Sequence, residues 1–175
     1  ANAARRFQWR SLRMNNQIAL INGSFKSSVS VFDRGLSYGD GLFETMSWSF
    51  IAEKNGVGVE FWKRHLKRIK NSCSIIKIKM PSIKILNNYK EKILKKSYKN
   101  GIRQGILKIL LTRGVGGRGY KFDRNMNPTV IFLSLPNVNR SFQFQKKGIE
   151  VKFCNSSISE NSQLAGLKHL NRLDS

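Results

Sequence analysis

The order of the apolar patterns along the chain constrains its fold more than any other feature. Two segments with helical periodicity lie in the middle, and segments with strand character precede and follow them. In parallel α/β folds, by contrast, strands alternate with helices along the chain. The order therefore predicts an α+β domain with a mostly antiparallel sheet, on which the two helices pack.

The two helical segments differ in how they end. The first begins near Trp62, and its apolar residues recur at spacings of three and four as far as Ile76, with lysines on the other face. The second covers about 83–98, and the Asn100-Gly101 pair after it is a typical helix stop. The residues expected to face the core from the second helix are Leu86, Tyr89, Ile93 and Leu94.

Six segments have strand character. Asn22-Gly23 separates the first two, and this dipeptide is the strongest short signal for a hairpin turn. Residues 33–41 hold three glycines, which predicts an irregular loop. The strands are predicted at 17–21, 24–31, 42–50, 106–112, 129–135 and 149–153.

The charge of the chain is strongly positive. Lys and Arg number 32 against 10 Asp and Glu, which gives a formal net charge of +22 over 175 residues. Such a charge is typical of nucleic-acid binding. The excess leans toward lysine on helical segments, without the interleaved aromatic side chains of a base-stacking surface, so we expect no nucleic-acid partner. Residues 1–13 hold four of the arginines and no acid, and we interpret them as a basic extension before the domain at 14–153.

Neither a membrane segment nor a metal site is expected. No apolar run is long enough to span a bilayer, and no signal-peptide pattern opens the chain, which favours a soluble cytoplasmic protein without a membrane partner. Cys73 and Cys154 form no C-x-x-C pair and have no histidine cluster beside them. The sequence therefore predicts free thiols and neither a disulfide framework nor a zinc ion.

Two polar segments stand out among the strands. Lys108 interrupts an apolar strand, and alternation places it on one face with Leu110 and Thr112. A lysine there needs an anionic partner, unless the strand is a sheet edge that leaves the amine in water. The loop after this strand has four glycines within residues 114–119, beside Arg113 and Arg118, and could receive a carboxylate or phosphate. It has neither the Walker ending nor the helix of a Rossmann turn.

A third segment, 164–174, contains Lys168 after a stretch of small residues. A lysine amine with a depressed pKa can form a Schiff base, and desolvation or a nearby cation would depress it. The segment fits the exposed first turn of a helix equally well. Similarly, the glycines of 33–45 fit a purely structural loop.

Together these segments resemble the fold type IV pyridoxal-phosphate enzymes. The resemblance rests on four motifs in the family's order, at 37–45, 65–68, 108–120 and 168–173, and covers residues 14–175. The class includes branched-chain aminotransferases, D-amino acid aminotransferases and aminodeoxychorismate lyases. The last two motifs are most similar to those of the lyases, which produce 4-aminobenzoate for folate biosynthesis.

The resemblance implies a cofactor, a substrate and a set of site residues. The cofactor would be pyridoxal 5'-phosphate, and the substrate 4-amino-4-deoxychorismate, split into pyruvate and 4-aminobenzoate. Lys168 would hold the cofactor as a Schiff base and move protons, and Thr45 would relay a proton to the leaving group. Arg68 would pair with the cofactor phosphate, while Lys108 and Arg118 would bind the substrate carboxylates.

The chain departs from the family at its C-terminal end. Fold type IV enzymes have a second domain that supplies the acid beside the pyridine nitrogen, whereas this sequence stops seven residues after Lys168. We interpret 154–175 as a linker and the start of a truncated C-terminal domain, and expect weak cofactor binding and little turnover from the chain alone. A homodimer is expected at full length. The alternatives are a branched-chain or D-amino acid aminotransferase and a non-catalytic truncated relative.

Overall fold

The fold is an α+β layer of one antiparallel sheet with two helices on one of its faces. The computed structural model describes residues 17–54, 56–136, 148, 151–153, 155 and 161–173. The strands are β1 (Ile18–Ile21), β2 (Ser24–Phe25), β3 (Gly41–Ile51), β4 (Gly56–Val59), β5 (Gln104–Thr112) and β6 (Thr129–Pro136). The helices are α1 (Arg34–Tyr38), α2 (Trp62–Ile76) and α3 (Ile83–Lys99), with a 3-10 turn, η2 (Ala52–Lys54).

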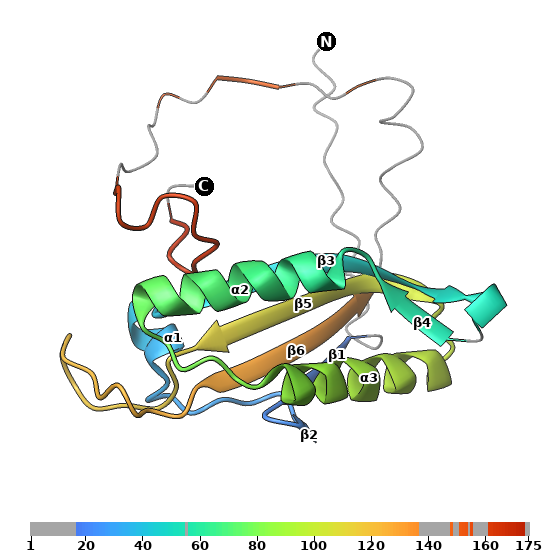
Figure 1. Ribbon diagram of the computed structural model, residues 1–175, viewed down its shortest axis with the longest axis horizontal. Helices are drawn as coiled ribbons and strands as arrows, with labels where there is room; N and C mark the ends of the chain where they lie inside the picture. Colours follow the sequence, from blue (N-terminus) through green and yellow to red (C-terminus); the bar gives the residue numbers. More distant parts are fainter. Residues whose placement is uncertain are drawn as a thin grey trace, which may run out of the picture.

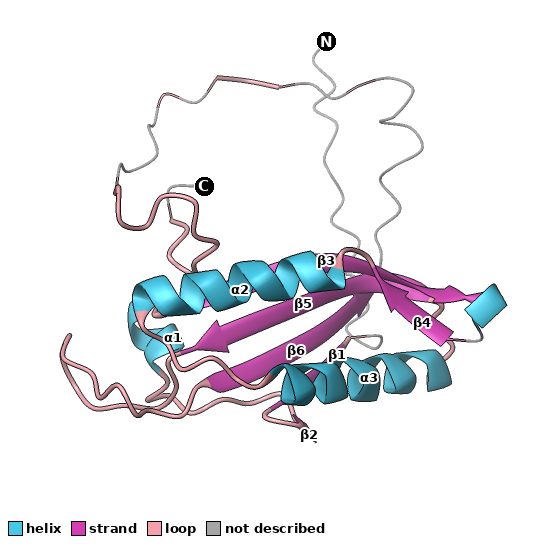
Figure 2. Ribbon diagram, viewed as in Figure 1, coloured by secondary structure: helices cyan, strands magenta, loops and turns pink. Residues whose placement is uncertain are grey.

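The sheet has the strand order β2-β1-β6-β5-β3-β4, and each neighbouring pair is antiparallel. Helix α2 packs on β3, and α3 packs on β6 and β1. Figure 1 and Figure 2 show α2 and α3 on the same side of the sheet. The predicted α+β class, the antiparallel sheet and the two packed helices are confirmed.

The core lies between the helices and the sheet. Alternate residues of β5 face it, since Leu107, Ile109 and Leu111 are buried and the residues between them are half-buried. The predicted inward residues of α3 are confirmed: Leu86, Ile93 and Leu94 are buried, and Tyr89 packs edge-on against Phe132. Each such aliphatic side chain stabilises the fold by about 1.5–3 kcal/mol relative to exposure.

Cys73 lies in this core between α2 and the sheet, at 1% exposure. Burial raises the pKa of its thiol to about 12, so the sulfur is protonated at neutral pH. The free, buried thiol predicted for this position is confirmed. Cys154 lies outside the described residues.

The prediction of an irregular loop at 33–41 is wrong, because residues 34–38 form helix α1. The Asp33 carboxylate accepts the Gly35 N–H at 2.8 Å, and Gly39 ends the helix in the left-handed conformation with φ 63°. These are ordinary helix-start and helix-stop residues, and they outweigh the glycine content that suggested a loop.

One predicted strand is too long, another has no strand in its described residues, and one strand was missed. β2 stops at Phe25 because residues 26–31 are exposed and have no sheet partner, so the prediction of 24–31 is wrong beyond its first two residues. Residues 151–153 of the strand predicted at 149–153 are exposed and not in a strand, and 149–150 lie outside the described residues. The missed strand, β4, contains two glycines, which are rare in strands.

None of the helices in the described ranges combines the length and the hydropathy that a membrane-spanning helix requires.

Candidate functional site

The candidate site lies at a gap in the outer edge of β3. One edge of β3 pairs with β5 along 41–49, whereas β4 pairs with the other edge only along 48–51. Residues 168–170 lie beside the start of this outer edge: the Phe43 N–H donates to the Lys168 carbonyl, and the Leu170 N–H donates to the Gly41 carbonyl, both at 2.9 Å. Between these two partners, no described strand pairs with 44–46 on the outer side.

The predicted Schiff-base lysine therefore sits in an extended segment. A one-residue bridge joins His169 to Leu42 and continues the pairing beside Lys168. The alternative that placed Lys168 in the first turn of a helix is wrong, because 167–172 contain no helix.

Two of the predicted site lysines lie close to the same aromatic ring. The Lys168 Nζ lies 4.4 Å from the centre of the Phe43 ring, and the Lys108 Nζ lies 5.3 Å from the same centre. Thr45 is the register partner of Lys108 on the adjacent strand, so both lie on the face of the sheet opposite α2 and α3. The ring attracts each ammonium group, and an anion between the amines would offset their mutual repulsion.

The structure also decides between the two explanations for Lys108. β5 lies between β3 and β6 and is an interior strand, so the alternative of a lysine at a sheet edge is wrong. Lys108 is half-buried on the face opposite Leu107 and Ile109, as its alternation predicts. Its amine thus lies over the sheet beside Phe43 and Thr45, where an anionic ligand would supply the partner that it needs.

Arg68 lies on the helix side of the same β3 edge. Its Nε donates to Glu44 Oε1 and its Nη2 to Glu44 Oε2, both at 2.5 Å, and His65 Nδ1 lies 2.8 Å from Glu44 Oε2. The hydrogen bonds to Glu44 raise the pKa of Arg68, although burial lowers it. The carboxylate is 1% exposed and the Arg68 side chain 48% exposed, so a buried anion orients a guanidinium that faces solvent.

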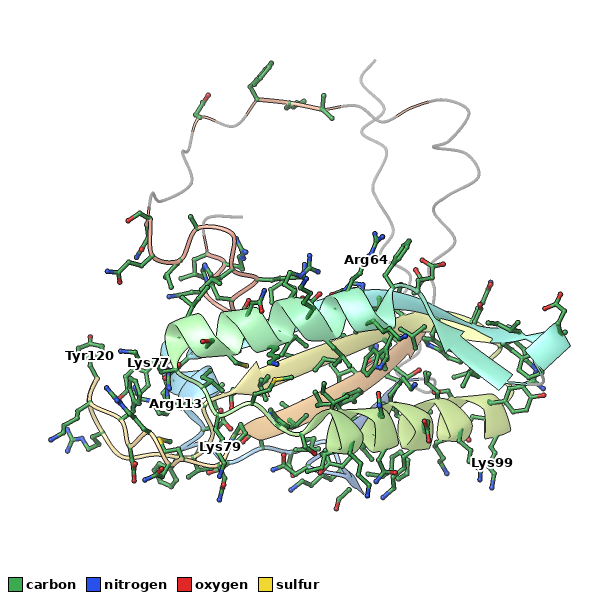
Figure 3. The ribbon with its side chains drawn as sticks, in the orientation of Figure 1. Arg64, Lys77, Lys79, Lys99, Arg113 and Tyr120 are labelled. Carbon is green, nitrogen blue, oxygen red and sulfur yellow. The ribbon has the colours of Figure 1, made fainter. Side chains whose placement is uncertain are left out.

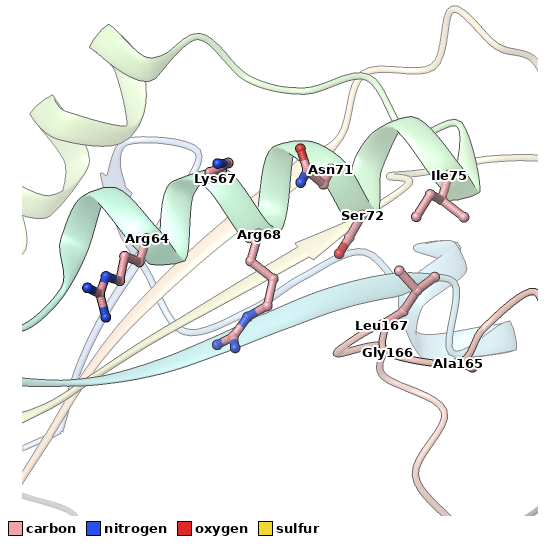
Figure 4. Close-up of a pocket in the computed structure, with 9 residues that line it drawn as sticks. All are labelled: Arg64, Lys67, Arg68, Asn71, Ser72, Ile75, Ala165, Gly166 and Leu167. Atoms are coloured by element: carbon pink, nitrogen blue, oxygen red, sulfur yellow. The ribbon is translucent and has the colours of Figure 1, made fainter.

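A cavity of about 370 Å³ opens between α2 and the segment that precedes Lys168 (Figure 4). Its polar walls come from one helix, and its opposite wall is the turn that leads into the lysine. The lining residues are Arg64, Lys67, Arg68, Asn71, Ser72, Ile75, Ala165, Gly166 and Leu167. Arg68 and the residue next to Lys168 therefore share one cavity.

Arg118 is not brought to the other predicted site residues. It lies exposed in the glycine loop, and no hydrogen bond or ion pair in the described part of the chain joins it to Lys108, Lys168, Thr45 or Arg68. Figure 3 shows the loop extending away from the sheet, with Arg113 at its base and Tyr120 farther out.

The base of the glycine loop is held by a half-buried carboxylate, Asp40, that the sequence reasoning missed. Asp40 accepts from Arg113 Nε at 2.7 Å and Nη2 at 3.0 Å, and from Arg34 Nε at 3.1 Å. Arg113 also donates to the carbonyls of Ile76 and Lys77, so its guanidinium is used in hydrogen bonds within the protein. Of the two arginines that flank the loop, only Arg118 offers a solvent-facing guanidinium.

Glu44 and Phe43 were also missed as functional residues, although both lie inside the 37–45 motif. A signal for Glu44 was present: alternation along β3 places this acid between Leu42 and Met46 on the covered face. A buried carboxylate needs a cationic or hydrogen-bonding partner. That requirement points to a cation on the helix above it.

His169 gives the site a pH-dependent component of stability. Its Nδ1 is buried without a hydrogen-bond partner among the described residues, and desolvation, followed by the charge of Arg172, lowers its pKa from 6.5. Because the unfolded chain binds this proton more readily, stability should be fully present above pH 6.5 and be lost as the pH falls through the lowered pKa.

We therefore expect the free energy of unfolding to fall between pH 7.5 and pH 5 more steeply in the wild type than in His169→Gln. Urea unfolding at a series of pH values measures both slopes. Carboxylate titration is common to the two proteins and cancels in the comparison. Parallel curves would contradict the assignment to His169.

The chain matches a family model and curated relatives. The model of the amino-transferase class IV family matches residues 41–175. An aminodeoxychorismate lyase from Vibrio harveyi is 29% identical over 154 residues, which is 88% of this chain and 53% of the relative. A putative branched-chain-amino-acid aminotransferase from Methanocaldococcus jannaschii is 32% identical over 120 residues, 66% of this chain and 39% of the relative.

The solved structures give the same result. The 4-amino-4-deoxychorismate lyase from Pseudomonas aeruginosa superposes with a TM-score of 0.74 and 31% identity, over 89% of this chain and 53% of that one. A hypothetical aminotransferase from Mycobacterium tuberculosis, in its PLP-bound form, has a TM-score of 0.61 at 18% identity over 75% of this chain and 44% of that one, which shows a shared fold. The chain spans about half the length of these relatives or less.

Proposed function

The chain belongs to the amino-transferase class IV family, and we propose that it carries the lysine-bearing half of a pyridoxal-phosphate-dependent 4-amino-4-deoxychorismate lyase. The observation that carries the proposal is that the Lys168 and Lys108 amines both lie close to the Phe43 ring, with Thr45 beside Lys108. One amine would form the covalent link to the cofactor, and the other would remain as a cation for an acidic substrate.

The residues present fit the phosphate end of this cofactor. The cavity between α2 and 165–167 has a volume in the range typical of small-molecule sites. The Arg68 fork and the Ser72 hydroxyl line it, and both are suitable donors to phosphate oxygens. Lys168 follows Leu167, a residue of the cavity wall, and its amine lies beside Phe43, on the other side of the β3 edge.

The proposed reaction breaks one carbon–oxygen bond and moves one proton. The ring carbon that bears the amine loses its proton, the bond to the enolpyruvyl oxygen breaks, and the ring becomes aromatic. The departing group takes up a proton to become pyruvate, and 4-aminobenzoate is the other product. Pyridoxal phosphate, when bound, would stabilise the electron pair left on that ring carbon.

Each side chain then has a separate task. The Lys168 amine would remove the ring proton as general base, and Thr45 would pass a proton to the departing oxygen within a relay, because a hydroxyl alone is a weak acid. Lys108 would hold a substrate carboxylate over the sheet, and Arg118 is proposed for the second carboxylate. Arg68 would fix the cofactor phosphate.

The second candidate is an aminotransferase of the same fold, which the match to the Methanocaldococcus jannaschii relative favours. A third is a non-catalytic relative. An aminotransferase needs a 2-oxo acid to accept the amino group, whereas the lyase releases pyruvate from a single substrate. Lys108 and Arg118 favour the lyase, because its substrate is a dicarboxylate.

We expect pyruvate to form from 4-amino-4-deoxychorismate without any added 2-oxo acid, and the release to disappear in Lys168→Ala. Pyruvate is measured with a coupled dehydrogenase, on this chain and on the complete product of its gene. An absolute requirement for a 2-oxo acid would contradict the lyase and support the aminotransferase. Absence of both activities, with the cofactor bound, would support the non-catalytic relative.

A further inference from the structure

The cavity beside α2 is lined by cationic side chains in addition to Arg68. Three cationic side chains of one helix line it: Arg64, Lys67 and Arg68. No acidic side chain of the described residues lines the cavity, so a ligand can use the charge of any of the three cations that lacks an acidic partner.

The charge of Arg68 is already neutralised. Glu44 accepts two hydrogen bonds from its Nε and Nη2, so the pair has no net charge. The side-on arrangement leaves the Nη1 hydrogens and the second Nη2 hydrogen for a ligand. Arg68 therefore orients a bound anion through its fixed donors but adds little net charge to the cavity.

Arg64 and Lys67 have no such partner. The described residues contain no ion pair to either side chain. Arg64 lies one helical turn before Arg68, its guanidinium 5.2 Å from the centre of the Phe61 ring. In Figure 4, Arg64 and Arg68 project from the same side of α2, whereas Lys67 lies on the upper side of the helix. Arg64 is thus the unpaired cation that can reach the ligand held by Arg68.

We propose that Arg64 is a second phosphate-binding arginine and supplies the net charge that Arg68 lacks. This inference rests on the proposed function and extends it to a residue not assigned by the motifs. A phosphate monoester carries about −1.5 to −2 charges at neutral pH, which the neutral Arg68–Glu44 pair alone would leave unbalanced. The division of roles follows: Arg68 orients the phosphate and Arg64 neutralises it.

The test compares ligands with and without the phosphate group. We expect Arg64→Gln to weaken the binding of pyridoxal phosphate about tenfold, as for loss of one charge-assisted hydrogen bond, and to leave pyridoxal binding unchanged. Arg64→Lys keeps the charge and should retain most of the affinity. Lys63→Gln is the matched control, because Lys63 is an exposed neighbour on α2 that does not line the cavity. Equilibrium titration monitored by absorbance gives the dissociation constants.

Three outcomes would overturn the inference. Equal weakening by Lys63→Gln would show a general effect of surface charge, and equal weakening of pyridoxal would show that Arg64 does not act through the phosphate. Unchanged binding in Arg64→Gln would exclude the residue directly. Inorganic phosphate, as a competitor, probes the cavity independently of Lys168, so a chain that binds phosphate but forms no covalent link would refute the proposed function and leave this inference standing.

Discussion

Borohydride reduction in the presence of pyridoxal phosphate should label this chain at Lys168, and Lys168→Ala should lose the label completely. The Lys168 amine lies beside the Phe43 ring, with the Lys108 amine near the same ring. The proposed function requires this amine, and no other, to condense with the cofactor aldehyde. Peptide mass mapping of the reduced protein identifies the labelled lysine.

Lys108→Ala is the matched control for this experiment. Lys108 contacts the same Phe43 ring, so labelling that depends only on an amine near that ring would be reduced in both variants. The proposed function requires that Lys108→Ala keeps the label on Lys168 and loses affinity for dicarboxylate ligands. A label on Lys108, or on surface lysines with Lys168 unmodified, would contradict it.

Most of the fold could be predicted from the sequence because its elements have clear periodicity. Helix α2 begins and ends where the three-and-four spacing of its apolar residues does, at Trp62 and Ile76. β5 and β6 are central strands, buried from one side and half-buried on the other, and their apolar runs reflect this. β4 could not be predicted, because its pairing with β3 stabilises a glycine-containing segment that has little strand propensity of its own.

The geometry of the site was only partly predictable, because it depends on contacts between distant segments. The family resemblance selected Lys168 and Arg68, but nothing local indicates that 168–170 would pair with the start of β3. That pairing places the Lys168 amine over Phe43. Likewise, Glu44 became recognisable as the partner of Arg68 only when α2 was placed over β3.

The strand alternation of β3 also explains how one edge serves two purposes. Glu44 faces the helices and binds Arg68. Phe43 and Thr45 face the opposite side, where the two lysine amines lie near the Phe43 ring. A ligand that contacts both groups must therefore pass the edge of the sheet. The unpaired stretch at 44–46 is the part of that edge where no described strand is in the way.

Removing Arg68 should destabilise the protein more than removing the charge of Glu44. In Arg68→Ala the Glu44 carboxylate, 1% exposed, keeps only His65 as a partner, and a buried charge without its counter-ion is costly. In Glu44→Gln the Arg68 guanidinium is half-exposed already and can turn into water.

We expect losses in the free energy of unfolding of about 2–3 kcal/mol for Arg68→Ala and about 1 kcal/mol for Glu44→Gln. The double variant Arg68→Ala/Glu44→Gln should be more stable than Arg68→Ala, because it no longer buries an unpaired carboxylate. Urea unfolding of the four proteins at pH 7 measures the cycle, and Arg64→Ala, which removes an arginine without an acidic partner from the same helix, is the control. If Glu44→Gln were the more damaging change, the exposed guanidinium and not the buried carboxylate would be the group that depends on the pair.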